Sequence, residues 1–190
     1  RCAWCGDDPL YVAYHDEEWG VPTRDDKTLF EFIILEGAQA GLAWITVLRK
    51  REGYRKLFDD FDPVKISRYS DKKLDKILLD PSIIRNRLKV YGARKNAIAF
   101  LKVQKEFGSF ANYIWKFVDG QPIQSKHKSL ADLPATSPVS DAISKDMKKR
   151  GFTFVGSTIM YAYMQACGMI NDHTTKCYRK RECKALDLPK

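Results

Sequence analysis

Several classes of protein are excluded by what this 190-residue sequence lacks. It has no apolar run long enough to cross a bilayer, and no positively charged stretch followed by a small-residue cleavage site near its first residue. Its five cysteines are odd in number and sparse, unlike the disulfide framework of a small secreted domain. We therefore expect a soluble, cytoplasmic protein with reduced thiols and no membrane partner.

The charge balance is basic. There are 33 Lys and Arg residues against 24 Asp and Glu, which gives a formal net charge of +9. This excess favours a polyanionic partner, most simply nucleic acid, although many soluble proteins are mildly basic without one. Because 44% of the residues are hydrophobic, the chain can bury a full core, and we expect a single domain over residues 1–190.

The apolar residues are spaced as in helices. Leu29 and Ile33, for example, lie four residues apart on one helical face. Ser137-Pro138 supplies an N-cap residue followed by a first-turn proline. The polar segment 120–138 is predicted to be a surface connection between two lobes. We expect an all-α protein whose helices cover residues 25–36, 40–58, 63–69, 71–79, 82–106, 109–118, 138–149 and 156–167.

Potential metal ligands lie near both ends of the sequence, Cys2 and His15 at one end and His173 and Cys177 at the other. The last two have the i, i+4 offset that places side chains on one face of a helical turn. Zinc prefers four Cys and His ligands in a tetrahedron, so this set predicts a zinc site that joins the two ends. Since four protein ligands leave no open coordination position, the zinc would be structural rather than catalytic.

Other residues could compete for the metal. Cys5 forms a CxxC with Cys2, and Cys183 is a further candidate, but we prefer the mixed set because it pairs a His with a Cys at each end. A thioredoxin-like role for the CxxC would need a βαβ context, which the chain does not offer. His127 is expected to be an exposed loop residue rather than a ligand.

The segment 147–158 combines a basic helix end with two glycines. Backbone N–H groups at the start of the second helix would face a phosphate, and the second glycine would let that phosphate approach closely. The alternative is an ordinary corner between two helices, and the adjacent basic residues favour phosphate binding. The candidate DNA-binding residues here are Lys149, Arg150, Gly151, Gly156 and Ser157.

Aromatic residues in the first third of the chain surround one acidic residue, Glu36. Glu36 follows a strongly apolar helical stretch and is expected to be partly buried, where a carboxylate needs a hydrogen bond or a charged partner. Aromatic faces with one oriented carboxylate make a pocket for a flat, polar ring such as a damaged nucleobase. The alternative is that these aromatics belong to the core and that Glu36 caps a helix. The aromatic residues concerned are Trp4, Tyr11, Tyr14, Trp19 and Trp44.

Four longer segments carry a resemblance to a known family. They are YVAYHDEEWGVP at 11–22, LEGAQAGLAWITVL at 35–48, RGFTFVG at 150–156 and MQACGMINDH at 164–173. Together, in this order and across essentially the whole chain, they are similar to the 3-methyladenine DNA glycosylase I family. The resemblance implies a helix-hairpin-helix DNA glycosylase fold, a structural zinc, and hydrolytic removal of 3-methyladenine from alkylated DNA.

The resemblance also implies roles for individual residues. Cys2, His15, His173 and Cys177 fall where the family binds zinc. Glu36 falls where the family's carboxylate hydrogen-bonds the damaged base, and Tyr14 and Trp44 fall where aromatic rings hold it. Trp4, Trp19 and Tyr11 lie near the same pocket.

The expected chemistry needs little acid catalysis, because an N3-methylated adenine is a cation and departs as a neutral base. The enzyme would flip the nucleotide out, stack the base on Trp44 and Tyr14, and let Glu36 accept a hydrogen bond from the exocyclic amine. Asp172 is ranked as a residue that supports the ligand His173 first and as a catalytic residue second. No motif indicates a lysine-based lyase step.

Leu42 is a candidate wedge for the gap that the flipped base leaves, although an ordinary core leucine is the simpler interpretation. We expect a monomer acting on double-stranded alkylated DNA. One lobe would hold the zinc and the segments 1–60 and 168–190, and the other, about 61–167, would hold the hairpin. The alternative function is a DNA-binding module that uses the same hairpin and structural zinc without chemistry.

Overall fold

The computed structural model describes residues 1–186, and helices form most of it. The α-helices are α1 (Pro9–Glu17), α2 (Asp26–Gln39), α3 (Trp44–Leu48), α4 (Arg51–Leu57), α5 (Pro63–Ser67), α6 (Asp71–Ile77), α7 (Arg87–Phe107), α8 (Phe110–Ile114), α9 (Pro138–Lys149), α10 (Ser157–Ala166) and α11 (Tyr178–Ala185). Short 3₁₀ turns lie at η1 (Ala3–Cys5), η2 (Asp59–Phe61), η3 (Trp115–Val118) and η4 (Leu130–Asp132). The predicted helical class is confirmed. None of the helices within residues 1–186 has the length and apolar composition of a membrane span.

Two helices were missing from the sequence-based prediction. α1 carries a cap signal, since Asp8 accepts hydrogen bonds from the backbone N–H groups of Leu10 and Tyr11 and Pro9 is the first helical residue. Its apolar residues, however, do not gather on one face, so periodicity gave no signal. α11 is almost entirely polar and has the same problem.

Some predicted boundaries were wrong. The single helix expected over 40–58 is two helices, α3 and α4, and it begins only at Trp44 because Gly41, with φ +82°, ends α2 in a turn. The helix expected from residue 82 begins at Arg87, where the Asn86 side chain accepts a hydrogen bond from the N–H of Lys89. α2 itself continues past its predicted end to Gln39.

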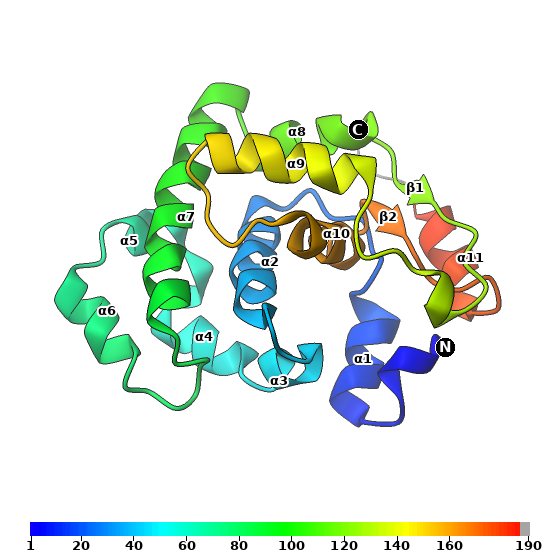
Figure 1. The fold of residues 1–190 in the computed structure, drawn as a ribbon, viewed down its shortest axis with the longest axis horizontal. Coiled ribbons are helices and arrows are strands. Elements are labelled where there is room, and N and C mark those ends of the chain that lie inside the picture. The colour runs from blue at the N-terminus through cyan, green and yellow to red at the C-terminus, as the bar shows by residue number, and fades with distance from the viewer. Residues whose placement is uncertain (187–190) are drawn as a thin grey trace.

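α2 is the central element of the core. Every residue from Leu29 to Ala38 is buried, and the helix packs against α7, α8 and α10. Figure 1 shows α2 between α7 and α10, with α9 passing across one side. A helix buried all round must place its polar residues with care, since each one needs a partner or a function.

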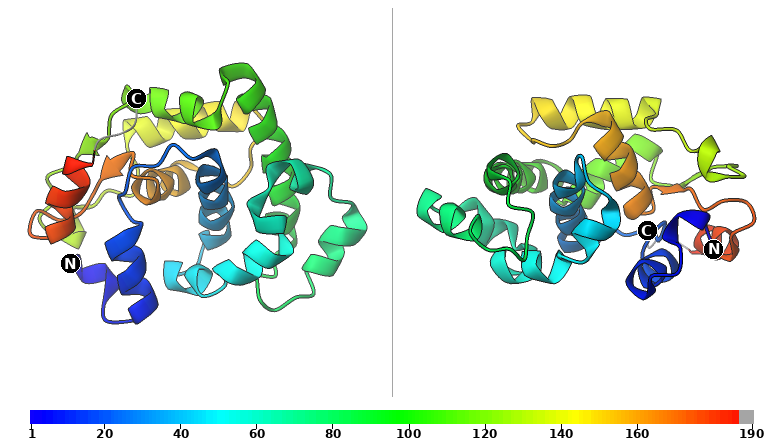
Figure 2. Two further views of the ribbon diagram at one scale, coloured as in Figure 1. Left: turned by 180° about the vertical axis from the view of Figure 1, so that it is seen from behind. Right: turned by 60° about the horizontal axis from the view of Figure 1, so that its bottom comes forward.

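The segments near the two ends of the described chain lie side by side. Figure 2 shows the blue N-terminal turn beside α11 in both views, although almost the whole sequence separates them. Nearby, β1 (Ile123–Gln124) pairs in parallel with β2 (Ile170–Asn171) and ties the predicted surface connection to the segment that precedes α11. The division into two lobes stays a prediction, and residues 187–190 of its terminal segment lie outside the described residues.

Candidate functional site

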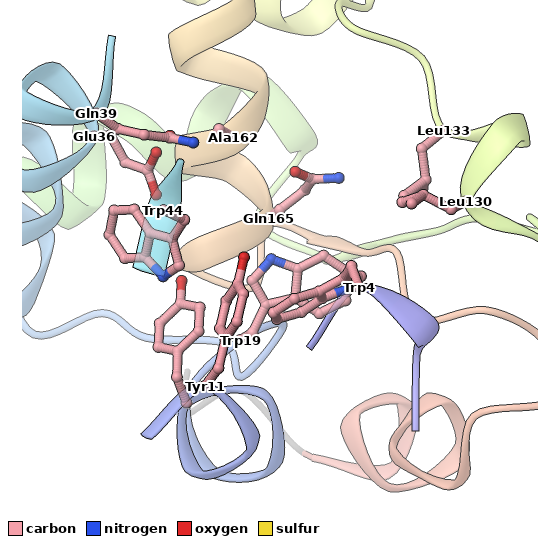
Figure 3. A pocket seen from close by; sticks show the side chains of 11 residues that line it. Trp4, Tyr11, Trp19, Glu36, Gln39, Trp44, Leu130, Leu133, Ala162 and Gln165 are labelled. Carbon is pink, nitrogen blue, oxygen red and sulfur yellow. The ribbon is translucent and has the colours of Figure 1, made fainter. Parts of the chain in front are cut away.

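A cavity of about 300 Å³ opens between α1, α2 and α10, and Figure 3 shows its lining. The structure brings together here all six residues of the aromatic box: Trp4, Tyr11, Tyr14, Trp19, Glu36 and Trp44. They come from separate parts of the chain. Trp4 lies in η1, Tyr11 and Tyr14 in α1, Trp19 in the turn after α1, Glu36 in α2 and Trp44 at the start of α3. The cavity volume falls in the range of small-molecule sites.

The Glu36 carboxylate is the chemically unusual group in the cavity. Only 3% of Glu36 is exposed, and its buried Oε2 has no hydrogen-bond partner among the described residues. Burial away from water raises the pKa of Glu36 to about 8. An unpaired buried carboxyl lowers the stability of the folded protein. Because such groups are concentrated at functional sites, Glu36 indicates a ligand-binding site.

The aromatic rings form the walls. Tyr14 and Trp44 have ring centroids 5.3 Å apart, and Trp4 lies 4.9 Å from Tyr11 and 5.0 Å from Trp19. The indole N–H groups of Trp4 and Trp44 are buried and, within residues 1–186, have no acceptor. The cavity therefore offers apolar faces, the N–H donors of two indoles and the Glu36 carboxyl, which suits a flat ring with polar edges.

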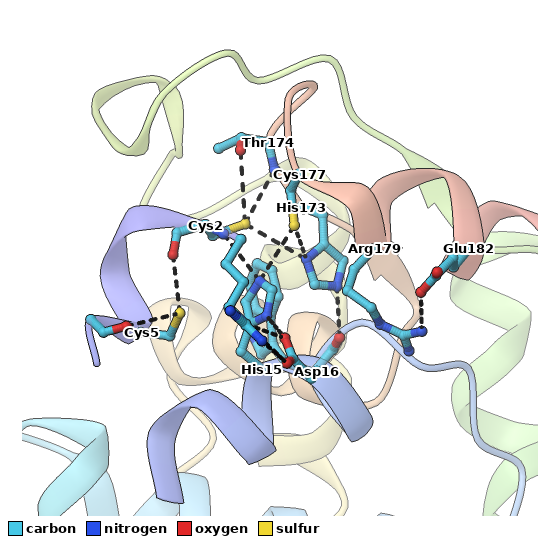
Figure 4. Close-up of polar contacts among 12 residues, drawn as sticks. Cys2, Cys5, His15, Asp16, His173, Thr174, Cys177, Arg179 and Glu182 are labelled. Carbon is cyan, nitrogen blue, oxygen red and sulfur yellow. Dashed lines mark hydrogen bonds and ion pairs between the residues drawn. The ribbon is translucent and has the colours of Figure 1, made fainter. Parts of the chain in front are cut away.

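A cluster of four buried side chains lies beside this cavity. The potential ligand atoms of Cys2, His15, His173 and Cys177 are all within 4.8 Å of one another. His173 Nδ1 is 3.6 Å from Cys2 Sγ and 3.5 Å from Cys177 Sγ, and His15 Nε2 is 3.5 Å from Cys177 Sγ. Figure 4 shows these atoms converging from the two ends of the described chain. The cluster could bind a metal ion.

The remaining polar atoms of the cluster have partners in the surrounding protein. His15 Nδ1 lies 2.8 Å from Asp16 Oδ1, and His173 Nε2 lies 2.9 Å from the Trp19 carbonyl oxygen. The backbone N–H of Thr174 donates to Cys2 Sγ at 3.4 Å. Burial lowers the pKa of His173 to about 3, so its ring is neutral, which is the form that binds metals. These contacts fix the ring orientations.

The competing ligands lie outside the cluster. Cys5 Sγ donates instead to the Cys2 carbonyl oxygen at 3.1 Å, and Cys183, although buried, does not join the four ligand atoms. The expected helical turn for His173 and Cys177 was wrong. Both lie in the loop before α11. There the Cys177 N–H donates to the Thr174 carbonyl oxygen, and Cys177 is the N-cap residue of α11.

The predicted hairpin joins α9 to α10 through residues 150–156. Asn96 of α7 holds it, accepting from the Thr153 N–H at 2.8 Å and donating to the Thr153 carbonyl at 3.0 Å. Gly92 makes room for it, since a Cβ there would lie 2.9 Å from Thr153 Cγ2. Gly151 has φ +93°, and open space surrounds the Cβ position of Gly156 at the start of α10. Gly151 therefore satisfies a backbone requirement, whereas Gly156, with φ −61°, leaves open space at the start of α10 without being required by the backbone.

The other candidate DNA-binding residues differ in whether neighbouring side chains already bind them. Lys149 is exposed and forms no ion pair within residues 1–186, whereas Arg150 is held by Glu106 at 2.7 Å and Asp146 at 2.6 Å. The Ser157 hydroxyl hydrogen-bonds the hydroxyl of Ser140 at 2.9 Å. An exposed lysine is thus the cation most available to a phosphate at this hairpin.

Leu42 is not a core leucine. It is 40% exposed in the turn between α2 and α3, at the same end of α2 as the cavity residue Gln39. The core interpretation of Leu42 is therefore wrong, and the candidate wedge stays a prediction.

Known proteins resemble this chain over most of its length. The methyladenine glycosylase family model matches residues 4–180. DNA-3-methyladenine glycosylase 1 of Escherichia coli (strain K12) is 50% identical over 177 residues, which are 93% of this chain and 95% of that protein. The chain belongs to the methyladenine glycosylase family. A crystal structure of a 3-methyladenine DNA glycosylase I superposes with a TM-score of 0.92 at 52% identity, covering 94% of this chain and 98% of the other.

A relative with a ligand is also similar. A variant of 3-methyladenine DNA glycosylase I, crystallised in complex with 3-methyladenine, has a TM-score of 0.92 at 33% identity and covers 94% of this chain and 96% of its own. The whole described fold, rather than one motif, is therefore shared with the methyladenine glycosylase family.

Sequence analysis missed part of the cavity lining of this family member. The additional lining residues are Gln39, Leu130, Leu133, Ala162 and Gln165. Leu130 and Leu133 come from the segment predicted to be only a surface connection, and nothing in its polar composition indicated a role at the cavity. Gln165 lies within the motif at 164–173 and Gln39 within the motif at 35–48. Membership of these motifs was the available sign that the two residues have a role at the site.

Asp172 is buried, and His127, which was expected to be exposed, is partly buried beside it. Asp172 is 1% exposed, and its Oδ2 accepts hydrogen bonds from Tyr161 at 2.6 Å and from Gln165 at 2.9 Å. His127 is partly buried, with Nε2 3.5 Å from Asp172 Oδ1, so the expectation of an exposed loop histidine was wrong. His127 is not part of the four-residue cluster.

Proposed function

We propose that this member of the methyladenine glycosylase family is a DNA repair enzyme that hydrolytically releases 3-methyladenine from alkylated DNA. The observation that carries the proposal is the Glu36 carboxyl, buried without a partner in a cavity with aromatic walls. Curated relatives named for this activity, and a similar structure that contains 3-methyladenine, support it.

Recognition would rest on complementarity to a cationic base. In this proposal the base stacks against Tyr14 and Trp44, and Glu36 accepts a hydrogen bond from its exocyclic amine. Because the pKa of Glu36 is raised to about 8, much of the carboxyl is neutral at pH 7, and a bound cation would favour its ionised form. That attraction would favour binding of the cationic base, and as the glycosidic bond breaks the base leaves neutral and the positive charge passes to the sugar. The proposed reaction stops at hydrolysis, without a lyase step.

We propose that the cluster holds a structural zinc ion through Cys2, His15, His173 and Cys177. Zinc bonds of about 2.3 Å to sulfur and about 2.0 Å to nitrogen, at a tetrahedral angle, would separate S and N ligand atoms by about 3.5 Å. Three of the four S to N distances in the cluster, at 3.5 to 3.6 Å, fit that value. Bound zinc would supply a fixed cross-link, and His15 and His173 would each keep a second hydrogen bond outside it.

The hairpin is the proposed grip on the DNA backbone, as in a helix-hairpin-helix module. The start of α10 at Gly156 has no side-chain cap and has open space beside it, which supports phosphate binding by its N–H groups. Lys149, Arg150, Gly151 and Ser157 belong to the same proposed surface. We propose double-stranded DNA as the substrate form and a monomer as the active form, because one chain supplies the whole cavity and the whole cluster.

The test is direct. Randomly methylated duplex DNA is incubated with the protein, and the released bases are separated by chromatography. We expect free 3-methyladenine, and we expect Glu36→Gln and Trp44→Ala to lower its release by about 10²-fold or more while duplex binding changes little. Unchanged release by either variant would refute the assignment of the cavity.

The second candidate function is a DNA-binding module without chemistry. The hairpin and the cluster would serve such a module equally well, but it would have no use for an unpaired buried carboxyl. A protein that binds methylated duplex and releases no base would establish this alternative.

A further inference from the structure

Gln165 is a cavity residue that the proposed mechanism does not yet use. It lies on α10, is partly buried, and lines the cavity together with Glu36 and Trp44. Figure 3 shows its side chain reaching into the space between Glu36 on one side and Trp4 on the other. A primary amide can present either a donor or an acceptor to a ligand, so its function depends on which way it is turned.

Asp172 determines that orientation. Its carboxylate can only accept hydrogen bonds, so the amide group of Gln165 must turn its NH₂ toward it, and Nε2 donates to Asp172 Oδ2 at 2.9 Å. The amide oxygen of Gln165 then lies on the side toward Glu36 and the NH₂ group on the opposite side, as Figure 3 shows. The reversed amide would place two oxygens against each other, which is unfavourable in a buried site.

Asp172 is itself fixed. It is 1% exposed, and Tyr161, which is also buried, donates its hydroxyl to the same Oδ2 at 2.6 Å. Tyr161 and Gln165 are four residues apart on α10, so both side chains extend from one face of the helix toward the same carboxylate. Two donors on one buried oxygen hold Asp172, and through it Gln165, in a single arrangement.

We infer that Gln165 Oε1 is a second hydrogen-bond acceptor for the exocyclic amino group of the bound base, and that Asp172 and Tyr161 position it for this purpose. An amino group has two N–H bonds, and Glu36 would use only one of them. A base with a carbonyl oxygen at that position would instead face acceptors from Glu36 and Gln165 with no donor between them. Gln165 is thus a specificity-determining residue. This inference rests on the proposed function.

The substrates compared are 3-methyladenine and 3-methylguanine in duplex DNA, which share the methyl position but differ at carbon 6, where adenine has an amino group and guanine a carbonyl, and at carbon 2, where guanine alone has an amino group. The experiment compares their single-turnover release by the wild-type protein and by Gln165→Met, which keeps the side-chain length without an acceptor. We expect release of 3-methyladenine to slow about tenfold, release of 3-methylguanine to change little, and the preference to narrow by about the same factor. Gln121→Met, at an exposed position outside the cavity, is the control and should leave both rates unchanged.

The possible results separate the two hypotheses. If the wild-type protein releases neither base, the proposed function fails whatever Gln165 does. If it releases 3-methyladenine and Gln165→Met slows both bases equally or neither, the inference about Gln165 fails and the proposed function stands. Equal slowing would point to a general structural effect.

A second variant protects the test against a folding defect in Gln165→Met. Asp172→Asn can offer an amide NH₂ to Gln165 and so permit its amide to reverse and present donors to the cavity. We expect the preference for 3-methyladenine over 3-methylguanine to narrow here as well, with 3-methylguanine released faster than by the wild-type protein. Metal content and the thermal midpoint are measured alongside, because Asp172 precedes His173. An unchanged preference with metal content intact would overturn the positioning role.

Discussion

The metal-ligand cluster and the base cavity are neighbours, yet their polar groups are treated in opposite ways. In the cluster, the ring nitrogens of His15 and His173 that face away from the four ligand atoms have an oxygen partner within 2.9 Å. In the cavity, Glu36 Oε2 and the indole N–H groups of Trp4 and Trp44 are buried without partners among residues 1–186. The histidine rings of the cluster are therefore held by the surrounding protein, whereas these cavity groups have no partner within residues 1–186.

The two regions should therefore contribute differently to the stability of the folded protein. Unpaired buried polar groups are unfavourable, so the cavity lowers the stability of the free protein in order to bind a ligand strongly. The cluster does the reverse, because a bound ion would link segments more than 150 residues apart in sequence. Variants in the two regions should therefore change stability in opposite directions.

The largest expected effect is loss of the metal-ligand cluster. Cys177→Ser, or removal of metal with a chelator, should lower the free energy of unfolding by at least about 4 kcal/mol, since structural zinc sites contribute directly to folding. Thermal unfolding with metal analysis measures this, and zinc should restore the chelated wild-type protein. Cys183→Ser, a buried cysteine outside the cluster, should cost much less. Wild-type protein that contains no metal and ignores the chelator would contradict the cluster assignment.

The next effect has the opposite sign. The folded-state pKa of Glu36 is about 8, above its ordinary 4.5, so the folded protein holds an extra proton between these values and loses stability as pH rises through that window. Glu36→Gln should remove this loss and raise the free energy of unfolding on the order of 3 kcal/mol at pH 9, with almost no change at pH 4. Denaturant unfolding at the two pH values measures it.

Glu31→Gln is the matched control for Glu36→Gln, because Glu31 is also buried on α2 but accepts a hydrogen bond from Arg51 Nε at 2.7 Å. It should destabilise the protein at pH 9, since it leaves the Arg51 charge incompletely paired. Equal destabilisation by both variants would contradict the expectation that the unpaired Glu36 carboxyl lowers the stability of the free protein.

A smaller effect is expected beside the cluster. Asp16 is held by Arg1, whose side-chain hydrogen bond keeps the pKa of Asp16 well below its usual range, and it contacts His15 Nδ1 at 2.8 Å. Asp16→Asn should weaken zinc binding about 10- to 100-fold, because this contact orients the ring. Competition with a chromogenic chelator measures the affinity. The neighbouring exposed Glu17→Gln should bind zinc as the wild-type protein does.

The smallest effect should come from the exposed turn beside the cavity. Leu42→Ala should slow release of 3-methyladenine from duplex DNA severalfold, about 1 kcal/mol of barrier, and leave stability unchanged because Leu42 is 40% exposed. Release from single-stranded DNA, which has no gap to fill, should change less. Leu79→Ala, at a leucine 77% exposed on another helix end, is the control. Equal slowing on both substrates would argue against a wedge.

The sequence indicated the chemistry of both regions better than their geometry. Glu36 was recognisable because an acidic residue follows a run of apolar ones, and the cluster because Cys and His occur in pairs. The cavity residues Leu130 and Leu133 were not recognisable, since their contribution depends on how a polar segment folds back, which β1 pairing with β2 determines. Contacts between distant segments leave no local pattern.

Helix prediction failed where packing rather than periodicity determines the structure. α11 is polar on nearly every face, and its start depends on Cys177, a residue fixed by the cluster. The i, i+4 offset of His173 and Cys177 suggested a helical turn, but a tight loop brings the two side chains together equally well. Spacing identified the residues that cluster but did not determine the backbone that presents them.

Trp19 belongs to both regions at once. Its ring lines the cavity, its carbonyl oxygen lies 2.9 Å from His173 Nε2, and its ring centroid is 4.7 Å from that of His173. The Trp19 indole therefore lies against a histidine of the proposed metal site and also lines the proposed base site. Intrinsic tryptophan emission should report both events in an unlabelled protein, and a variant that keeps only Trp19 of the indoles would show whether filling one region alters the optical signal of the other.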